Sequence, residues 1–384
     1  MKTVGIICEY NPFHLGHRKQ LDLIRGTCGD DCAIVCLMSG NFVQRGQPAI
    51  FDKSVRAQAA IECGADLALE LPVIFALSSA EGFAAGGVRI LSAFCDGLSF
   101  GTESGTADTL MSTAGALLQP EFPKMLKQQL QTGFSFPAAR QQALEALGCD
   151  ASLLKSPNDI LAVEYCKAIA QQQSPLVPMP IHRQGDYHDT LPDPENPSAT
   201  ALRQLLKSGG WEAYVPENIR ELYGSAPLHT LQAGERAVLA KLRSMSEEEF
   251  EALPYGSEGL WRKLMHACRR ESSLEAIAQA VKSKRYTRTR IDRMLMCAYL
   301  GISRETLTQA PPYTRVLAFS ERGRSVLKNA RKQGSFPHVG EMIQHPYQHL
   351  EQRWDDLYGL FQVDAPAPAG SESKRRVYMK TPPK

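Results

Sequence analysis

Short apolar runs alternate with helical patterns over the first two hundred residues of the chain. Compact apolar segments end in polar or turn residues at 3–8, 32–38, 67–71, 97–100 and 176–182. Between them, apolar residues recur with helical spacing at 17–24, 54–63, 80–92 and 158–171. Because strands that alternate with helices at this spacing form βαβ units, the pattern predicts an α/β fold with a parallel sheet and helices on both faces.

The pattern changes near residue 198. Beyond it helical periodicity predominates, at 199–206, 235–242, 260–270, 274–281 and 287–300, with a further strand signal at 313–318. Three prolines within 191–197 mark a loop near the junction. The tail combines Pro, Ala, Gly and Ser with five Lys/Arg, which predicts disorder. We therefore expect an α/β domain at 1–200, a mainly helical domain at 201–363 and a disordered tail at 364–384.

Composition and charge narrow the class of protein. A 43% hydrophobic content with 22% charged residues excludes wholesale disorder, and no apolar run reaches the roughly 18–20 residues of a membrane span. No secretory signal pattern is visible, so the ten cysteines are expected to stay reduced in a cytoplasmic protein. Residues 1–200 hold 14 Lys/Arg against 21 Asp/Glu, whereas 201–384 hold 29 against 20. The basic half is where a polyanion would bind, although an ordinary charged surface would give the same totals.

The most informative motif lies at residues 6–21, where a predicted strand runs into His14-Leu15-Gly16-His17 and then a helix. Ligands of open α/β sheets lie beyond the carboxyl ends of the strands, and a helix N-terminus attracts anions. His14 and His17, three residues apart, can face one ligand together and donate to phosphate oxygens. The alternative is that His14 caps a loop and His17 is an exposed helix residue. No GxGxxG or Walker A sequence supports the other common phosphate-binding motifs.

The motif resembles the signature of the HIGH-type nucleotidyltransferase superfamily, and further segments narrow the resemblance. They follow in order at 39–48, 52–56, 64–72, 100–103, 156–159, 182–183, 187–189, 198–203 and 284–287. This series, over residues 1 to about 300, is similar to the bacterial tRNA(Met) cytidine acetate ligase family. The resemblance implies a Rossmann-like nucleotidyltransferase domain and ATP-dependent activation of acetate as acetyladenylate. It also implies acetyl transfer to N4 of the wobble cytidine of elongator tRNA(Met), with neither DNA nor a membrane as a partner.

The resemblance also assigns site residues. In the superfamily the two histidines, here His14 and His17, stabilise the pentacovalent phosphate. Gly101 lets the adenosine lie against the backbone, and Arg183 can pair with a phosphate oxygen. Ser156 and Pro157 predict a helix start that leaves Asn158 free for ribose or base, the alternative being an Asn that only solvates the helix end. The full set expected to bind ATP is Ile7, Cys8, Glu9, Asn11, Pro12, Phe13, His14, Gly16, His17, Gln20, Gly101, Asn158 and Arg183.

Two further segments are expected to bind phosphates. Residues 198–203 are similar to the second superfamily signature, so Ser198, Thr200 and Arg203 are expected at the β- and γ-phosphates, although Ser198 reads equally well as a helix N-cap. Thr200 and Leu202 stand where Ser and Ile are commoner. The densest charge run, 282–293, predicts tRNA contacts or, alternatively, a solvated helix face; its candidates are Lys284, Arg285, Tyr286, Arg288, Arg290 and Arg293.

Metal sites and competing functions complete the expectations. The spacing of Cys28, Cys32 and Cys36 matches no zinc pattern, so buried thiols are expected and no metal site. Mg²⁺ is expected to accompany ATP, without identifiable protein ligands. Two other functions stay open: an adenylyltransferase acting on a small phosphorylated metabolite, and a non-catalytic nucleotide- and RNA-binding protein. The sequence does not indicate the acyl pocket, the base for the cytosine amine or the oligomeric state.

Overall fold

Five parallel strands form the centre of one sheet. The computed structural model describes residues 1–182, 198–308, 311, 313–333, 338–339 and 346–381. The central strands are β1 (Thr3–Cys8), β2 (Ala33–Ser39), β5 (Leu67–Leu71), β6 (Gly97–Thr102) and β7 (Val177–His182). They lie in the order β5-β2-β1-β6-β7, at the positions where the apolar runs predicted strands. The predicted Rossmann-like α/β fold is confirmed.

The sheet changes direction of growth at β1. The chain first builds outward from β1 to β2 and β5, and then returns to the other side of β1 to form β6 and β7. Both neighbours of β1 are parallel to it, with Thr3 beside Ala33 of β2 and Val4 beside Gly97 of β6. The loops after β1 and β6 therefore diverge, and the carboxyl ends of these two strands mark the position at which open α/β sheets form a ligand crevice.

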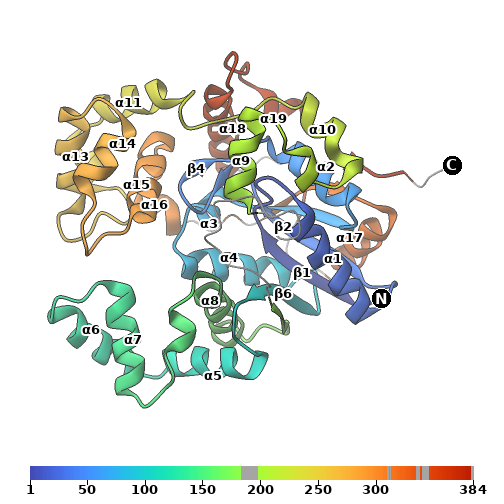
Figure 1. Ribbon diagram of the computed structural model, residues 1–384, viewed down its shortest axis with the longest axis horizontal. Coiled ribbons are helices and arrows are strands. Elements are labelled where there is room, and N and C mark those ends of the chain that lie inside the picture. The colour runs from blue at the N-terminus through green and yellow to red at the C-terminus, as the bar shows by residue number, and fades with distance from the viewer. Residues whose placement is uncertain (183–197, 309–310, 312, 334–337, 340–345, 382–384) are drawn as a thin grey trace.

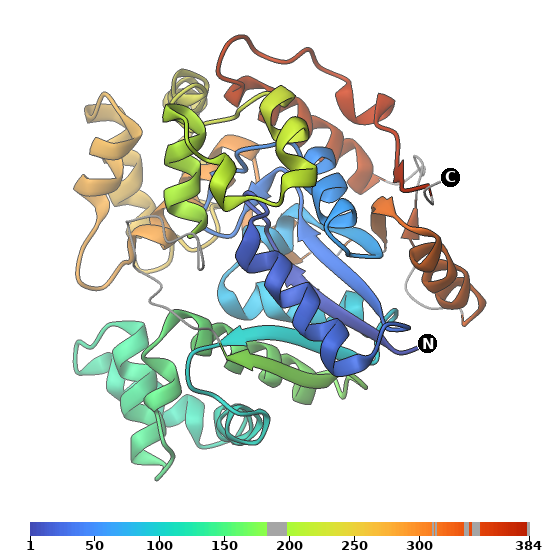
Figure 2. The same cartoon turned by 45° about the vertical axis from the view of Figure 1, so that its right-hand side comes forward.

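Helices cover both faces of the sheet (Figures 1 and 2). Side chains alternate along β1, so Val4 and Ile6 pack with Leu21 and Ile24 of α1 (Leu15–Cys28), whereas Ile7 faces the opposite core. Helix α2 (Lys53–Glu62) lies on the α1 face. The opposite face is covered by α4 (Ala80–Leu91), α5 (Ala107–Leu117) and α8 (Pro157–Gln171).

Several short elements interrupt this α/β pattern. After β2, a hairpin of β3 (Phe42–Val43) and β4 (Gln47–Pro48) projects from the sheet, and α3 (Val73–Ala76) follows β5. Between α5 and α8 the chain forms α6 (Phe122–Gln131), α7 (Phe136–Ala146) and η1 (Ser152–Leu154). Figure 1 shows α6 and α7 standing away from the sheet at one end of the molecule.

The C-terminal half builds a second, helical core. Its elements are α11 (Glu235–Ser244), α12 (Glu247–Glu251), α13 (Leu260–Arg270), α14 (Leu274–Val281), α15 (Arg288–Leu300), α16 (Arg304–Thr308), α18 (Pro346–Tyr358) and η4 (Gly359–Phe361). The elements that precede them, α9 (Ala199–Ser208), η2 (Glu212–Tyr214), η3 (Glu217–Ile219) and α10 (Arg220–Ser225), pack instead on the α1 face of the sheet. Leu264, Ile277 and Met294 are fully buried in the helical core. Phe42 of the hairpin and Ile74 of α3 belong to the same core, so the two halves share apolar contacts.

The end of the chain differs from expectation. Strand β8 (Thr314–Phe319) joins the main sheet antiparallel to β5, although its position predicted a strand within the helical half. Strands β9 (His338–Val339) and β10 (Tyr378–Met379) pair with β8, and α17 (Glu321–Lys332) follows it. The tail expected to be disordered contains α19 (Ser371–Lys374) as well as β10. The sequence pattern changes at residue 200, but strands from both sides of this position belong to the same sheet.

A buried ion cluster explains the ordered tail. The ammonium of Lys53, with a side chain only 1% exposed, lies 2.8 Å from Glu70 Oε1, 2.8 Å from Asp355 Oδ2 and 3.0 Å from Glu372 Oε2. These carboxylates come from β5, α18 and α19, so one cation joins the sheet to the tail. Arg375 adds a second ion pair, to Asp52. Burial alone would raise the pKa of Asp52, but Arg375 lowers it well below its ordinary value.

The cysteines are all free thiols. Cys32 and Cys36 are buried in the apolar cluster between the sheet and α1, as predicted, whereas Cys28 at the end of α1 is only half-buried. Burial raises the pKa of Cys32 to about 11, so this thiol stays protonated near neutral pH. No helix in the described part of the chain is long and apolar enough to cross a membrane.

Lys53→Met is expected to lower the free energy of unfolding by about 3–5 kcal/mol, because it leaves three buried carboxylates without their shared cation. Urea denaturation followed by circular dichroism measures the change. Lys127→Met, at an exposed position of α6, is the matched control and should change stability by less than about 0.5 kcal/mol. Equal midpoints for both variants would contradict the role assigned to Lys53.

Candidate functional site

Two histidines begin helix α1 directly beyond β1. His14 is the N-cap of the helix, and its Nδ1 accepts a hydrogen bond from the backbone N–H of Gly16 (3.1 Å). The backbone N–H of His14 in turn donates to Nδ1 of His17 (3.3 Å). The two rings stack with centroids 3.7 Å apart. The structure thus brings both predicted histidines together, and His14 is also a cap, although of the helix rather than of a loop.

This reciprocal capping fixes the chemistry of the two rings. Because Nδ1 of each ring accepts a hydrogen bond, the proton of each neutral imidazole lies on Nε2. Gly16 leaves room for the His14 ring, since a Cβ at this position would lie 3.1 Å from His14 Nδ1. The N-terminus of α1 adds the positive end of the helix dipole. Imidazole N–H groups beside a helix N-terminus are the kind of donors that bind an anion.

Aromatic side chains support His17 from behind. The Tyr10 and Phe13 rings lie 4.8 and 5.5 Å from the His17 ring, centroid to centroid. Tyr10 adopts a positive φ of 44°, and its hydroxyl lies 3.4 Å from Cys36 Sγ. Tyr223 of α10 accepts a hydrogen bond from the backbone N–H of Phe13 (3.0 Å). The loop that carries the histidines is therefore held from both the sheet and the C-terminal half.

Arg56 of α2 joins the ends of β1 and β2. Its fully buried guanidinium donates from Nη1 to the carbonyls of Glu9 (2.6 Å) and Ser39 (3.1 Å). Its Nε donates to the carbonyl of Phe51 (2.9 Å), and its Nη2 to that of Gly40. Sequence reasoning assigned Arg56 no role of its own. The signal for one was weak, because backbone carbonyl partners leave no mark in the sequence.

The two superfamily signatures touch each other at Asn11. Its side chain accepts a hydrogen bond from the backbone N–H of Ile50 (2.7 Å), and its carbonyl accepts one from Arg203 Nη1 (2.8 Å). Arg203 Nη2 also donates to the hydroxyl of Thr200 (3.1 Å). Ser198 caps α9, accepting from the backbone N–H of Ala201 (3.1 Å). The structure thus brings Arg203 to the loop that carries His14.

On the other side of the crevice, Asp159 organises the loop after β6. Its buried carboxylate accepts hydrogen bonds from the backbone N–H of Glu103 (2.8 Å) and the hydroxyl of Ser104 (2.7 Å), and from Thr102. Burial opposes ionisation of Asp159, but these donors lower its pKa. Sequence reasoning quoted this residue in a motif but overlooked its role; an acidic residue in the first turn of a helix was the available signal.

Asn158 differs from the sequence expectation. Its side chain is not free but donates to Glu103 Oε1 (2.6 Å). Ser156 occupies the N-cap position of α8, yet its hydroxyl makes no capping hydrogen bond to a described residue. Gly101 lies in β6 beside Ile181 of β7. Asn158 and Gly101 therefore flank the β6 side of the crevice, opposite the histidines.

The remaining predicted nucleotide-binding residues lie along the strand, loop and first helix. Ile7 of β1 is buried in the core on the face of the sheet opposite α1, and burial raises the pKa of Cys8 well above its ordinary value. Glu9 Oε1 accepts a hydrogen bond from the backbone N–H of Gln44 (2.8 Å). Pro12 is buried in the loop, and Gln20 is partly exposed on α1. Arg183 and the motif at 187–189 lie outside the described residues.

Most arginines of the basic run contact the protein itself. Arg288 pairs with Glu275 (2.7 Å) and Asp292 (2.8 Å). Arg290 donates to the carbonyl of Tyr255 (2.6 Å), and Arg293 to that of Gln44 (3.4 Å).

Only part of the basic run at 282–293 is exposed to solvent. Lys284 and Arg285 are exposed, although Arg285 pairs with Glu258 (2.7 Å). Tyr286 is partly buried and donates to Glu258 (3.2 Å). The part of the run that a polyanion could reach most easily is therefore 282–285.

Comparison with known proteins gives consistent matches over nearly the whole chain. A family profile described as HIGH Nucleotidyl Transferase matches residues 1–372. The chain is 35% identical over 373 residues to the tRNA(Met) cytidine acetate ligase of Clostridium acetobutylicum, covering 91% of this chain and 92% of the relative. It is 36% identical over 364 residues to the Clostridium novyi enzyme of the same name, covering 88% and 89%.

Two solved structures of TmcAL from Thermotoga maritima are similar to this fold. The apo form superposes with a TM-score of 0.90 at 31% identity, covering 99% of both chains. A form bound with alpha-thio ATP superposes with a TM-score of 0.88 at 30% identity, again covering 99% of both chains.

His14→Ala is expected to destabilise the protein by about 1 kcal/mol, because the first turn of α1 loses its cap. His14→Asn should restore most of this loss, since Asn is a favoured N-cap residue that can also accept from the backbone of Gly16. Urea denaturation of the two variants measures the difference. Equal stability of His14→Ala and the parent protein would contradict the capping role.

Proposed function

Because the chain belongs to the HIGH nucleotidyl transferase family and, within it, to the tRNA(Met) cytidine acetate ligases, we propose that it acetylates a tRNA cytidine at the expense of ATP. Acetate is activated as acetyladenylate, and the acetyl group passes to N4 of the wobble cytidine of elongator tRNA(Met). The observation that carries the proposal is the pair of imidazoles at the N-terminus of α1, each with its proton on Nε2. These are donors suited to the oxygens of a phosphate.

ATP binds across the carboxyl ends of β1 and β6 in this proposal. The α-phosphate lies at His14 and His17, and the adenosine lies toward Gly101 and Asn158. The β- and γ-phosphates extend toward Ser198, Thr200 and Arg203. The hydrogen bond from Arg203 to the Asn11 carbonyl (2.8 Å) supports this arrangement, because it holds a guanidinium beside the histidine loop. The similar Thermotoga maritima structure bound with alpha-thio ATP supports ATP as the nucleotide.

In the first step a carboxylate oxygen of acetate attacks the α-phosphorus of ATP. The new P–O bond forms as the bond to pyrophosphate breaks, and the acetyl carbon then carries AMP as a good leaving group. Negative charge grows on the α-phosphate oxygens, where the two Nε2–H groups and the dipole of α1 stabilise it. The imidazoles therefore act as electrostatic catalysts and remove no proton.

In the second step the N4 amine of the cytosine attacks the acetyl carbon. The N–C bond forms, the bond from the acetyl carbon to the AMP oxygen breaks, and the amine loses a proton. The excess of Lys/Arg over Asp/Glu in residues 201–384 supports binding of an RNA. Lys282, Lys284 and Arg285 are the exposed basic residues of the run and would contact its phosphates.

Mg²⁺ commonly accompanies ATP in reactions of this kind, and it would neutralise phosphate charge when bound. Among the described residues, no three His, Cys, Asp or Glu side chains gather in a way that could hold a metal ion.

Exchange of labelled pyrophosphate into ATP is expected to require acetate and to proceed without tRNA, because acetyladenylate formation precedes acetyl transfer. His14→Asn should reduce the exchange rate by at least about 100-fold while keeping the fold, since it retains the helix cap but removes an Nε2–H donor at the α-phosphate. His266→Asn is the matched control, because His266 is exposed on α13.

The outcomes separate the competing activities. Exchange driven by a phosphate ester instead of acetate would indicate an adenylyltransferase of small metabolites. Absence of exchange with every acid tested, despite ATP binding, would contradict the proposed catalysis. Added tRNA should then yield N4-acetylcytidine, detected by nucleoside mass spectrometry.

A further inference from the structure

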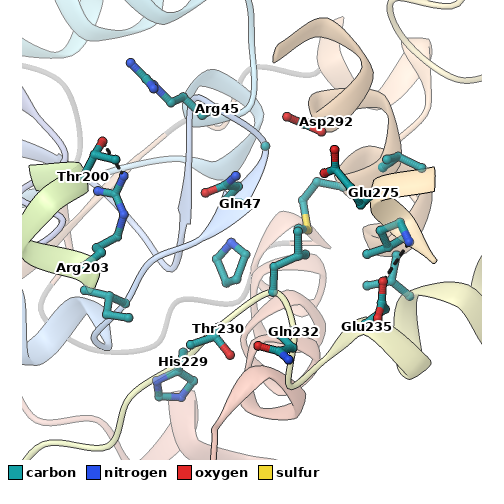
Figure 3. A pocket seen from close by; sticks show the side chains of 18 of the residues that line it. Arg45, Gln47, Thr200, Arg203, His229, Thr230, Gln232, Glu235, Glu275 and Asp292 are labelled. Carbon is teal, nitrogen blue, oxygen red and sulfur yellow. Dashed lines mark hydrogen bonds between the residues drawn. The ribbon is translucent and has the colours of Figure 1, made fainter. Parts of the chain in front are cut away.

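A cavity of about 540 Å³ lies beside the nucleotide crevice, where the two halves of the chain meet (Figure 3). Its walls come from the β3–β4 hairpin, α9 and the helices α11, α14 and α15. The volume falls within the roughly 300–1,000 Å³ of small-molecule sites. The cavity shares Thr200 and Arg203 with the proposed phosphate site. Its lining, as far as the described residues show, does not include His14, Gly101 or Asn158. It is therefore distinct from the proposed position of the adenosine.

The carboxylates of the cavity lie on one wall together with Arg288, and the other basic side chains lie on the opposite wall. Arg45 of the hairpin and Arg203 of α9 lie on one wall, and Glu275 and Asp292 lie on the opposite one (Figure 3). Lys207 of α9 also lines the cavity and is exposed. A fitting ligand thus carries an anion at one end and hydrogen-bond donors at the other. A nucleotide whose base has an exocyclic amine satisfies both conditions, whereas acetate supplies no donor.

The acidic wall is held in a fixed orientation. Arg288 donates from Nε to Asp292 Oδ1 (2.8 Å) and pairs through Nη2 with Glu275 Oε2 (2.7 Å). An ionised carboxylate has about four acceptor positions, so the contact with Arg288 orients Asp292 without using all of them. Burial raises the pKa of Asp292 even though Arg288 opposes this effect.

The two walls are also fixed relative to each other. Gly46, with φ +74°, packs so closely against α15 that a Cβ would lie 2.4 Å from the backbone nitrogen of Arg293. Arg293 Nη1 donates to the carbonyl of Gln44 on the same hairpin (3.4 Å). The hairpin that carries Arg45 is therefore docked on the helix that carries Asp292.

We propose that this cavity receives the target cytosine nucleotide after it is extruded from the RNA loop. Its flanking phosphates lie beside Arg45 and Lys207, next to the ATP phosphates at Arg203, and its exocyclic N4 amine donates to Asp292. Carboxylates are the usual acceptors for this amine, and the O4 of a uracil would be repelled at the same place. Enzymes that modify a base in a structured RNA or DNA commonly take the base out of its stack. This assignment rests on the proposed function and adds the residues that read the base.

Binding of two labelled anticodon stem-loop RNAs, identical except for C or U at the wobble position, tests the assignment by fluorescence anisotropy without ATP. The parent protein should prefer the C form by about tenfold or more. Asp292→Asn should reduce this preference to less than about twofold, through weaker binding of the C form. Glu305→Gln, an exposed carboxylate of α16, is the matched control and should keep the full preference.

Lys207→Met provides an independent variant on the opposite wall. It should weaken binding of both RNAs alike and reduce the slope of log affinity against log salt by about 1. Unchanged C preference in Asp292→Asn, or no preference in the parent protein, would overturn the assignment. The assignment would also be overturned if Lys207→Met weakened ATP binding and left RNA binding unchanged, because the cavity would then hold the triphosphate.

Acetate-dependent pyrophosphate exchange distinguishes failure of this assignment from failure of the proposed function. The exchange needs no RNA, so Asp292→Asn should keep the parent rate. Loss of exchange in this variant alone would also contradict the assignment, since Asp292 would then act in acetate activation. Absence of exchange in the parent protein would instead remove the proposed function.

Discussion

The first turn of α1 is the constraint on which the site depends. A helix N-terminus leaves backbone N–H groups without partners inside the helix, and here a histidine ring satisfies one of them. The same geometry makes both rings acceptors at Nδ1, so that Nε2 carries the proton. Capping and anion binding therefore arise from one arrangement. Arg56 and Tyr223 hold the loop in place, because they bind the backbone directly before and within the motif.

Long-range contacts bring the C-terminal half to this site. Arg203 binds the carbonyl of Asn11, and Gly46 packs against α15, so both halves contribute to the surroundings of the crevice. The buried ammonium of Lys53 joins β5, α18 and α19 through three carboxylates. Removing an ion from water is costly, and only close pairing offsets that cost. The same cluster therefore orders the tail.

The pattern of apolar and polar residues predicted the helices and strands whose formation depends on residues close together in the sequence. The central strands appeared as short apolar runs, and His14 and His17 were identified because a strand, a turn and a helix start coincide in the sequence. The strand β8 was predicted, but its antiparallel pairing with β5 and the order of the tail were not, since both depend on partners that lie far away in the chain, such as β5 and Asp52. Arg56 and Asp159 were overlooked for the same reason: backbone groups are among their main partners. The partner of Asn158, Glu103, likewise could not be read from spacing.

The central claim is that the two imidazoles bind the α-phosphate of ATP at the N-terminus of α1. A crystal structure of the protein with α,β-methylene ATP tests it most directly. The account predicts an α-phosphate oxygen within about 2.7–3.2 Å of Nε2 of both His14 and His17, with adenine on the side of Gly101. A nucleotide bound elsewhere, or an α-phosphate that contacts neither ring, would contradict the account.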